Sequence, residues 1–178
     1  MSVVPGSQTK DRRGQMTRHD RLIPDEESRT FLRQHAVAHV GTRDEAGWPY
    51  VVPLMYVYEE GAHLFLHTGG RGGHFLANTQ ADPRICISVS EPGPMHHGSP
   101  SPCNSALVYK SVIGYGKVQV CQGPDLTEQK TWFFDRLLER LGESRAGYQA
   151  GYTMLDRIIL YEVNLEIITG KVNVGLHH

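Results

Sequence analysis

The sequence predicts a mainly β protein, built as an antiparallel closed or split barrel with a few helices outside it. Roughly six apolar, β-like runs follow one another through tight turns, as consecutive hairpins do. Helical patterns do not alternate with these runs, which argues against a parallel βαβ sheet. The longest run carries two glycines on one face, Gly114 and Gly116, as a sharply bent barrel strand requires. Together these features favour a barrel over an open sheet.

Length, charge and cysteine usage narrow the class of protein. The chain has 178 residues, which suits one compact domain, and its net charge of −1 gives no reason to expect nucleic-acid binding. No apolar run is long enough to span a bilayer and no signal-peptide core is present, so we expect no membrane contact and a cytoplasmic location. The three cysteines form no CxxC pair and are typical of reduced cytosolic thiols. Cys103 with His96 and His97 matches no compact metal site, so we expect no metal.

The N-terminal part of the chain predicts an arm followed by the folded domain. Residues 1–21 are polar and charged without periodicity, so we expect a flexible N-terminal arm and a single domain over residues 22–178. Pro24 suits the first position of a helix, and the carboxylates that follow it favour the helix N-terminus. This helix should end near His35. Ala36–Thr42 is then a short strand that turns back through a hairpin.

The middle of the chain alternates strands with turns and one short helix. Tyr50–Tyr58 and Ala62–Thr68 are predicted as paired strands joined by a tight turn. A short helical pattern begins near His74, and Arg84–Ser90 is the next strand. The following stretch, Glu91–Ser105, is rich in Pro, Gly and Ser, so we predict a loop there. Its length suggests a lid or an interface segment.

The C-terminal half contains two more strands and the longest helix. Ala106–Cys121 is the longest strand pattern, and Asp125–Leu141 has the apolar spacing of an amphipathic helix that Gly142 ends. Glu143–Thr153 is a connector that contains Gly and Tyr. Arg157–Ile167 alternates apolar and polar residues, as a half-buried strand does.

Four glycines surround Arg71 where the strand Ala62–Thr68 ends. Because glycine has no Cβ, backbone N–H groups in such a loop can converge on an anion that bulkier residues would hold off. A helix that starts near His74 would aim its positive end at the same place. The loop is therefore a candidate phosphate seat. A flexible surface loop without a ligand is the alternative, and the glycines alone do not separate the two.

Four segments, taken in order, carry a resemblance to a known family. They are VVPLMYVY, LFLHTGGRGGHFLANTQADPRICISVS, YKSVIGYGKVQV and LEIITGKVN, and the match covers about residues 22–173. The set resembles the flavin-binding split-barrel proteins related to pyridoxamine 5′-phosphate oxidase, and among these the nitroimidazole-resistance (Nim-type) proteins. The shared features are a strand with an internal proline, a loop ending in Gly-His or Gly-Arg, an N/D-P-R/K strand start, a Y-x-S-V strand and a terminal S/T-G-K. The chain departs from the pattern at Phe75, where the family frequently has a lysine beside the histidine.

The resemblance implies a six-stranded antiparallel split β-barrel of the FMN-binding type. It also implies a homodimer that holds FMN between its subunits, with the ring of the flavin lying on barrel strands. The implied FMN contacts are the backbone of Val52, Pro53, Leu54 and Met55 along the ring, His67 and Thr68 beside the ring and ribityl chain, Arg71, Gly72, Gly73 and His74 around the phosphate, and Tyr109 and Ser111 against the pocket wall.

The function implied by the resemblance is that of an FMN-dependent oxidoreductase. It would reduce a small planar acceptor such as a nitroimidazole, as an antibiotic-resistance-type nitroreductase does. His67 is the candidate catalytic residue, since an unperturbed imidazole titrates near neutral pH and can donate a proton. The alternative is that His67 only packs on the flavin or bonds to a backbone carbonyl. The loop GGRGGH does not fit the dinucleotide fingerprint G-x-G-x-x-G, so NAD(P)H as the reductant would bind only transiently.

Two further functions stay open on the sequence. The first is a pyridoxamine 5′-phosphate oxidase-like enzyme that acts on a phosphorylated pyridine, for which the C-terminal strand offers mainly Arg157 and Lys171 as additional cations. The second is a non-catalytic protein that binds flavin or haem, a possibility that the histidine-rich stretch Met95-His96-His97 keeps open.

Overall fold

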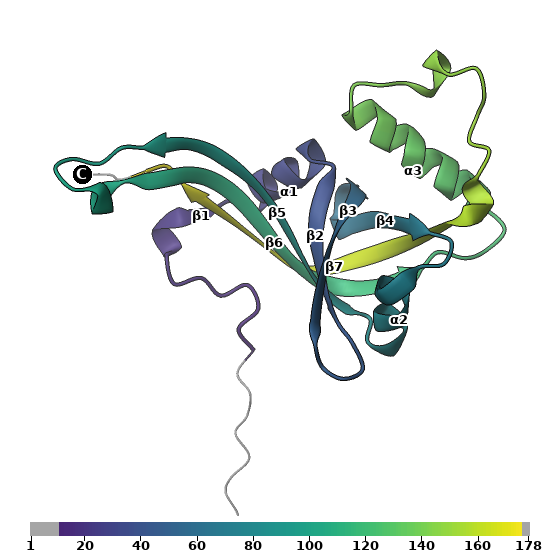
Figure 1. The fold of residues 1–178 in the computed structure, drawn as a ribbon, viewed down its shortest axis with the longest axis horizontal. Coiled ribbons are helices and arrows are strands. Elements are labelled where there is room, and N and C mark those ends of the chain that lie inside the picture. The colour runs from purple at the N-terminus through teal and green to yellow at the C-terminus, as the bar shows by residue number, and fades with distance from the viewer. Residues whose placement is uncertain (1–10, 176–178) are drawn as a thin grey trace, which may run out of the picture.

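The computed structural model describes residues 11–175, which form seven strands of one antiparallel sheet and three α-helices (Figure 1). The strands are β1 (Leu22–Ile23), β2 (Val37–Arg43), β3 (Pro49–Tyr58), β4 (His63–Gly69), β5 (Arg84–His96), β6 (Ala106–Val120) and β7 (Ile158–Asn173). The helices are α1 (Asp25–Gln34), α2 (Gly73–Ala81) and α3 (Leu126–Arg140). The predicted mainly β fold is confirmed. Residues 1–10 of the predicted arm and residues 176–178 lie outside the described residues, and the boundary of the arm at residue 21 stays a prediction.

The strands β2 to β7 close into a ring, which is the predicted six-stranded antiparallel barrel. The sheet order is β1-β7-β4-β3-β2-β5-β6, and β6 pairs with β7 as well, so the ring is complete. The seventh strand, β1, was not predicted. It consists of two residues, Leu22 and Ile23, which pair with Lys171 and Gly170 of β7. Two residues are too few to show the alternation on which a strand prediction depends.

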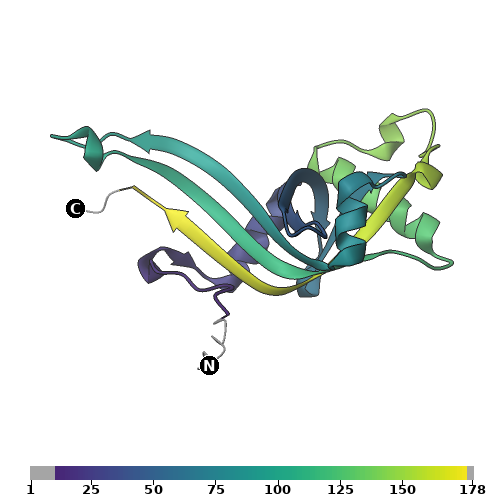
Figure 2. The ribbon, with the colours of Figure 1, turned by 60° about the horizontal axis from the view of Figure 1, so that its bottom comes forward.

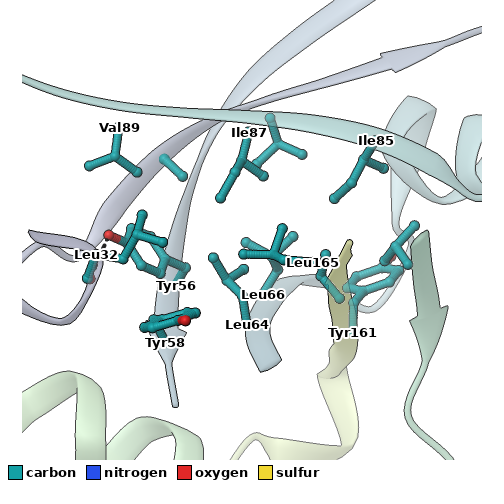
Figure 3. Close-up of a cluster of buried hydrophobic side chains, with 14 of the residues drawn as sticks. Leu32, Tyr56, Tyr58, Leu64, Leu66, Ile85, Ile87, Val89, Tyr161 and Leu165 are labelled. Carbon is teal, nitrogen blue, oxygen red and sulfur yellow. Dashed lines mark hydrogen bonds between the residues drawn. The ribbon is translucent and has the colours of Figure 1, made fainter. Parts of the chain in front are cut away.

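Alternate side chains of the ring point inward and form the core (Figure 3). Leu64, Leu66 and Ile87 are fully buried, and each such side chain contributes about 1.5–3 kcal/mol relative to an exposed one. Tyr56 is also fully buried, and its hydroxyl donates to the carbonyl of Leu32 at 2.8 Å, which ties α1 to the barrel. Burial raises the pKa of Tyr56, so the hydroxyl keeps its proton and the hydrogen bond at any ordinary pH.

The helix α3 lies on the outer face of the barrel over a second, smaller apolar cluster. Phe133 and Leu137 of α3 are buried against Val57 of β3 and Leu160 of β7. The helix runs over nearly the predicted range, and the chain leaves it at Gly142, whose φ of +78° suits glycine.

The prediction of a loop over Glu91–Ser105 was wrong for its first part, because β5 continues to His96. Beyond Ser88 the partner of β5 is β6 alone, and the register shifts between Pro92 and Met95. Proline is tolerated in a strand at a free edge or at such an irregularity, which is why the composition misled the prediction. Only the segment 97–105, with a short 3₁₀ turn at Pro102–Asn104, connects β5 to β6.

The strand β7 also runs past its predicted end at Ile167, to Asn173. The outer parts of three strands, residues 90–96 of β5, 106–112 of β6 and 168–173 of β7, therefore project from the barrel as one twisted ribbon (Figure 2). We call this ribbon the wing. The wing carries Tyr109 and Ser111, two of the predicted cofactor contacts. It places them far from the closed end of the barrel.

Candidate functional site

The barrel is split between β3 and β4. The two strands pair only from Tyr56 to Tyr58 of β3 with Leu64 to Leu66 of β4. Toward its start, β3 pairs with β2 alone, and from His67 onward β4 pairs with β7 alone. The strands therefore diverge between Met55 and His67, and each has a free edge there. Both residues are among those predicted to contact a cofactor.

The backbone of β3 presents hydrogen-bonding groups to this split. The N–H of Tyr56 donates to Ala36 of the chain leading into β2 at 2.9 Å. Because bonded and non-bonded pairs alternate in an antiparallel ladder, Leu54 also bonds to β2, while Pro53 and Met55 turn their backbone groups toward the free edge. Pro53 has no N–H, yet at this position no ladder bond is lost. The free edge offers the N–H of Met55 and the carbonyls of both residues.

The side chains of this segment point to either side of the sheet. Val52 and Leu54 pack on the barrel core, and Met55 packs toward α3. Pro53 itself is exposed. All four predicted residues thus lie along the split, but only Pro53 and Met55 have backbone groups available at its edge.

The glycine loop lies at the end of β4 and leads directly into α2. Gly72 and Gly73 have φ values of +60° and +55°, and the N–H of Gly72 donates to the carbonyl of Gly69 at 2.8 Å. The turn is therefore tight and depends on glycine. The N–H of Gly73 donates to the carbonyl of Arg71 at 2.6 Å. The next two N–H groups of α2, those of His74 and Phe75, have no partner within the helix and can bind an acceptor in front of it.

A cavity of about 580 Å³ lies at this loop. Its lining residues are Thr68, Gly69, Gly70, Arg71, Gly72, Gly73 and Arg157. The predicted residues Thr68, Arg71, Gly72 and Gly73 are thus brought together around one space. Two guanidinium groups and a glycine backbone are a donor set that fits a phosphate.

Arg157 is the residue of this site that sequence reasoning did not assign to it. It ends the 3₁₀ turn Leu155–Arg157, and the pairing of Ile158 with Gly69 brings it beside the loop. A Cβ on Gly70 would lie 2.9 Å from the carbonyl oxygen of Arg157, so the loop and the turn are in close contact. No local sequence pattern links the glycine loop to the turn that carries Arg157. The two become neighbours only through the pairing of β4 with β7.

His74 and Phe75 begin α2 with different roles. His74 is exposed, and its ring meets that of Tyr50 edge-on at 5.5 Å. Phe75, which stands where the resembling family frequently has a lysine, is only 2% exposed and packs against Tyr161 at 5.1 Å. Phe75 is therefore a core residue in this chain. Tyr161 in turn shares a hydrogen bond of 2.9 Å with the hydroxyl of Thr68.

His67 lies on the outer face of β4, under α3. Its ring is 5.3 Å from that of Phe133 and 5.1 Å from that of Phe134. Its Nδ1 is buried and has no hydrogen-bond partner among residues 11–175. Burial lowers the pKa of His67, so the imidazole is neutral at pH 7. The result is an unpartnered imidazole nitrogen next to the split.

Tyr109 and Ser111 are not brought to the glycine loop within one chain. They lie in the wing, where Ser111 pairs with Ser90 and Lys171, and the Lys171 Nζ lies 5.4 Å from the ring of Tyr109. On β7, Ile158 at the loop and Lys171 are more than ten residues apart, which is on the order of 40 Å of extended chain. The predicted cofactor contacts therefore form two separate groups.

Other features of the described part of the chain do not compete for this role. A larger cavity, of about 1000 Å³, has Glu59, Glu162 and Trp132 among its lining residues, but no lysine or arginine, so it does not suit a phosphate. Within residues 11–175, no three His, Cys, Asp or Glu side chains are grouped to hold a metal ion. No helix in the same range is long and apolar enough to cross a membrane.

Comparison with known proteins identifies relatives of the chain. A family model described as pyridoxamine 5′-phosphate oxidase matches residues 24–172. A candidate 5-nitroimidazole antibiotic resistance protein from Bacteroides thetaiotaomicron is 25% identical, with a TM-score of 0.67, over 85% of this chain and 86% of that one. Two further solved structures share the fold. The flavocytochrome Anf3 from Azotobacter vinelandii is 21% identical, with a TM-score of 0.75, over 95% of this chain and 78% of that one. A FAD-binding protein from Mesorhizobium loti is 21% identical, with a TM-score of 0.61, over 85% of this chain and 95% of that one. No curated protein sequence matches the chain at a significant level.

Proposed function

The chain belongs to the pyridoxamine 5′-phosphate oxidase family, and from this membership we propose that it binds FMN in the split between β3 and β4. One observation carries the proposal: the free edges of the split lead to a cavity that two arginines and a glycine turn line. A flat ring with a phosphate tail matches this arrangement, because the ring needs edge hydrogen bonds and the tail needs cations.

The residues of the chain would divide the work as follows. Arg71 and Arg157 bind the phosphate, with the loop glycines allowing its close approach. The N–H of Met55 and the carbonyls of Pro53 and Met55 bond to the ring edge. When bound, a flavin supplies hydride and electron transfer, and the protein supplies position and proton contacts.

We further propose that the chain is an oxidoreductase that reduces a small planar acceptor, such as a nitroimidazole, with NAD(P)H as a transient reductant. The support is the 25% identity to a candidate nitroimidazole resistance protein over most of both chains. His67 is the candidate proton donor: as a buried, neutral imidazole next to the split, it would donate its ring N–H proton rather than that of an imidazolium. We expect His67→Gln to retain bound flavin but to turn over about a hundredfold more slowly, the lower end of the range typical of general acids. Single-turnover kinetics with a nitroimidazole measures this; an unchanged rate would make His67 a packing residue.

We propose a homodimer in which a second copy of the chain completes the site. Tyr109 and Ser111 cannot reach the glycine loop of their own chain. The wing that carries them also exposes large apolar side chains, with Met95 53% and Leu107 44% exposed. Exposed apolar surface of this kind is typical of a contact between subunits.

The experiment that tests the function begins with the absorption spectrum of the purified protein after incubation with FMN. We expect flavin bands that stay with the protein through gel filtration, bleach with NADH or NADPH, and return when a nitroimidazole is added. Bleaching with pyridoxamine 5′-phosphate in place of NADH or NADPH, followed by return of the bands with oxygen, would support the oxidase alternative. A Soret band would identify a haem protein, and bands that never bleach would identify a flavin carrier without activity.

A further inference from the structure

A buried lysine on α3 has no counter-charge. Lys130 is only 7% exposed, and its Nζ donates to the backbone carbonyl of Leu155 at 2.8 Å. No carboxylate of residues 11–175 lies within 4.0 Å of it. Because burying an ammonium group costs free energy, the hydrogen bond to Leu155 is the contact that compensates Lys130 within the described residues.

The acceptor of Lys130 belongs to the turn that carries Arg157. Leu155 is the first residue of the 3₁₀ turn Leu155–Arg157, which the N–H of Arg157 closes by donating to Met154 at 2.9 Å. The chain before this turn is exposed throughout residues 141–151, and Tyr152 then ties it to α3 by donating to Asp135 at 2.9 Å. The hydrogen bond from Lys130 is the contact that holds the turn itself, at Leu155, against α3.

The turn is in direct contact with the glycine loop. A Cβ built on Gly70 would lie only 2.9 Å from the carbonyl oxygen of Arg157. Arg157 also lines the same cavity as Arg71. A shift of the turn Leu155–Arg157 would move the guanidinium of Arg157. The same shift would displace the glycine loop, because the two segments are in contact at Gly70. The distance between the two arginines thus depends on where α3 holds Leu155.

We propose that Lys130 is a positioning residue for the phosphate seat, acting through the Leu155 carbonyl to hold Arg157 across the cavity from Arg71. The inference rests on the proposed flavin site and adds a specific role to a residue that does not touch the cofactor. Arg157 with Arg71 then matches the two negative charges of a terminal phosphate, which FMN carries and riboflavin lacks.

The test compares the affinities of FMN and riboflavin for the full-length protein, because their ratio isolates the phosphate. The variants are Lys130→Met, Lys130→Arg, Arg157→Gln and the double variant Lys130→Met/Arg157→Gln, with Lys117→Met as the control. Lys117 is an exposed lysine that pairs with Glu166 at 3.4 Å on another face of the barrel. Thermal melts of each variant verify folding.

We expect Lys130→Met to lower the FMN-to-riboflavin affinity ratio by about tenfold, the effect of weakening one charge-assisted contact. Lys130→Arg should restore most of the ratio, and Lys117→Met should not change it. The double variant should be no worse than Arg157→Gln alone, because Lys130 acts through Arg157.

Three results would overturn the inference. Lys130→Met could lower both affinities equally, which would assign Lys130 to the stability of α3. The two single effects could add in the double variant, which would separate Lys130 from Arg157. Lys130→Met could also leave the ratio unchanged. A wild-type protein that binds neither flavin would instead contradict the proposed function itself, so the two failures are distinguishable.

Discussion

Arg71 is an exposed guanidinium on a loop of glycines, and its charge is central to the proposed seat. We expect Arg71→Ala to weaken FMN binding by about 1.5–3 kcal/mol, the usual worth of a hydrogen bond to a charged group. Riboflavin binding should not change, because riboflavin has no phosphate. Fluorescence titration of both flavins measures this, with Arg136→Ala as a control, since Arg136 is an exposed arginine on α3 that pairs with Glu139. An equal loss of affinity for FMN and for riboflavin would mean that Arg71 does not bind the phosphate.

The buried imidazole of His67 gives a second prediction, on pH. Its pKa is lowered from 6.5 in the folded protein, so the unfolded chain binds more protons as the pH falls below that value. The free energy of unfolding is therefore unaffected by this group above pH 6.5, and it decreases as the pH falls from 6.5 toward the lower pKa of His67 in the folded protein. Urea unfolding at pH 7.5 and 5.5 should show a smaller loss of stability on acidification in His67→Gln than in the wild type.

The exposed histidine His39 provides the control for that measurement. His39→Gln should lose stability on acidification as much as the wild type does. If His67→Gln also matches the wild type, the imidazole is not buried in solution as the structure has it.

Single residues of the site differ in how far the sequence predicts them. Arg71 and the loop glycines stand out in the composition as a candidate phosphate seat, but the composition alone does not separate this seat from an empty surface loop. Arg157 does not stand out in this way, since it reaches the cavity through the pairing of β4 with β7. Phe75 stands where the family frequently has a lysine. The reason is visible only in the structure, where Phe75 packs against Tyr161 in the core.

At the scale of elements, periodicity predicted the helices and the barrel strands well. α1 and α3 have strong end signals, and their bounds agree with prediction to within one or two residues. Two of the errors, at β5 and at β1, share one physical cause. The end of β5 contains Pro92 and Pro94, and the two-residue β1 has no pattern, so in both cases the pairing partner rather than local preference decides the structure.

The strand β6 depends on close contact at Gly116, which tests the element directly. A Cβ there would meet the backbone carbonyl of Asn164 on β7, at the place where the register shifts. Since backbone cannot move aside as a side chain can, we expect Gly116→Ala to destabilise the protein by about 1–3 kcal/mol. Chemical unfolding measures the loss.

Gly147→Ala is the matched control for that substitution. Gly147 has open space around its Cβ position and no positive φ, so the change should be within about 0.5 kcal/mol of neutral. A neutral Gly116→Ala would show that β6 and β7 are farther apart in solution.

At the scale of the whole molecule, the wing and the glycine loop are the two halves of one proposed site, separated in each chain. If two copies complete each other, Arg71→Ala and a Tyr109→Ala/Ser111→Ala variant should each bind FMN weakly, yet a mixture refolded together should regain tight sites. In a two-fold dimer with random pairing, about a quarter of all sites then carry both intact halves. Titration of the mixture measures this fraction. No recovery would mean that one chain builds its own site.

The most direct test of the account is a crystal structure of the protein with FMN. We expect the phosphate at roughly 2.7–3.2 Å from the guanidinium groups of Arg71 and Arg157, and the ring edge on the backbone of Pro53 and Met55. A flavin bound elsewhere, or β3 and β4 paired across Met55 and His67 with no room between them, would contradict the proposed site.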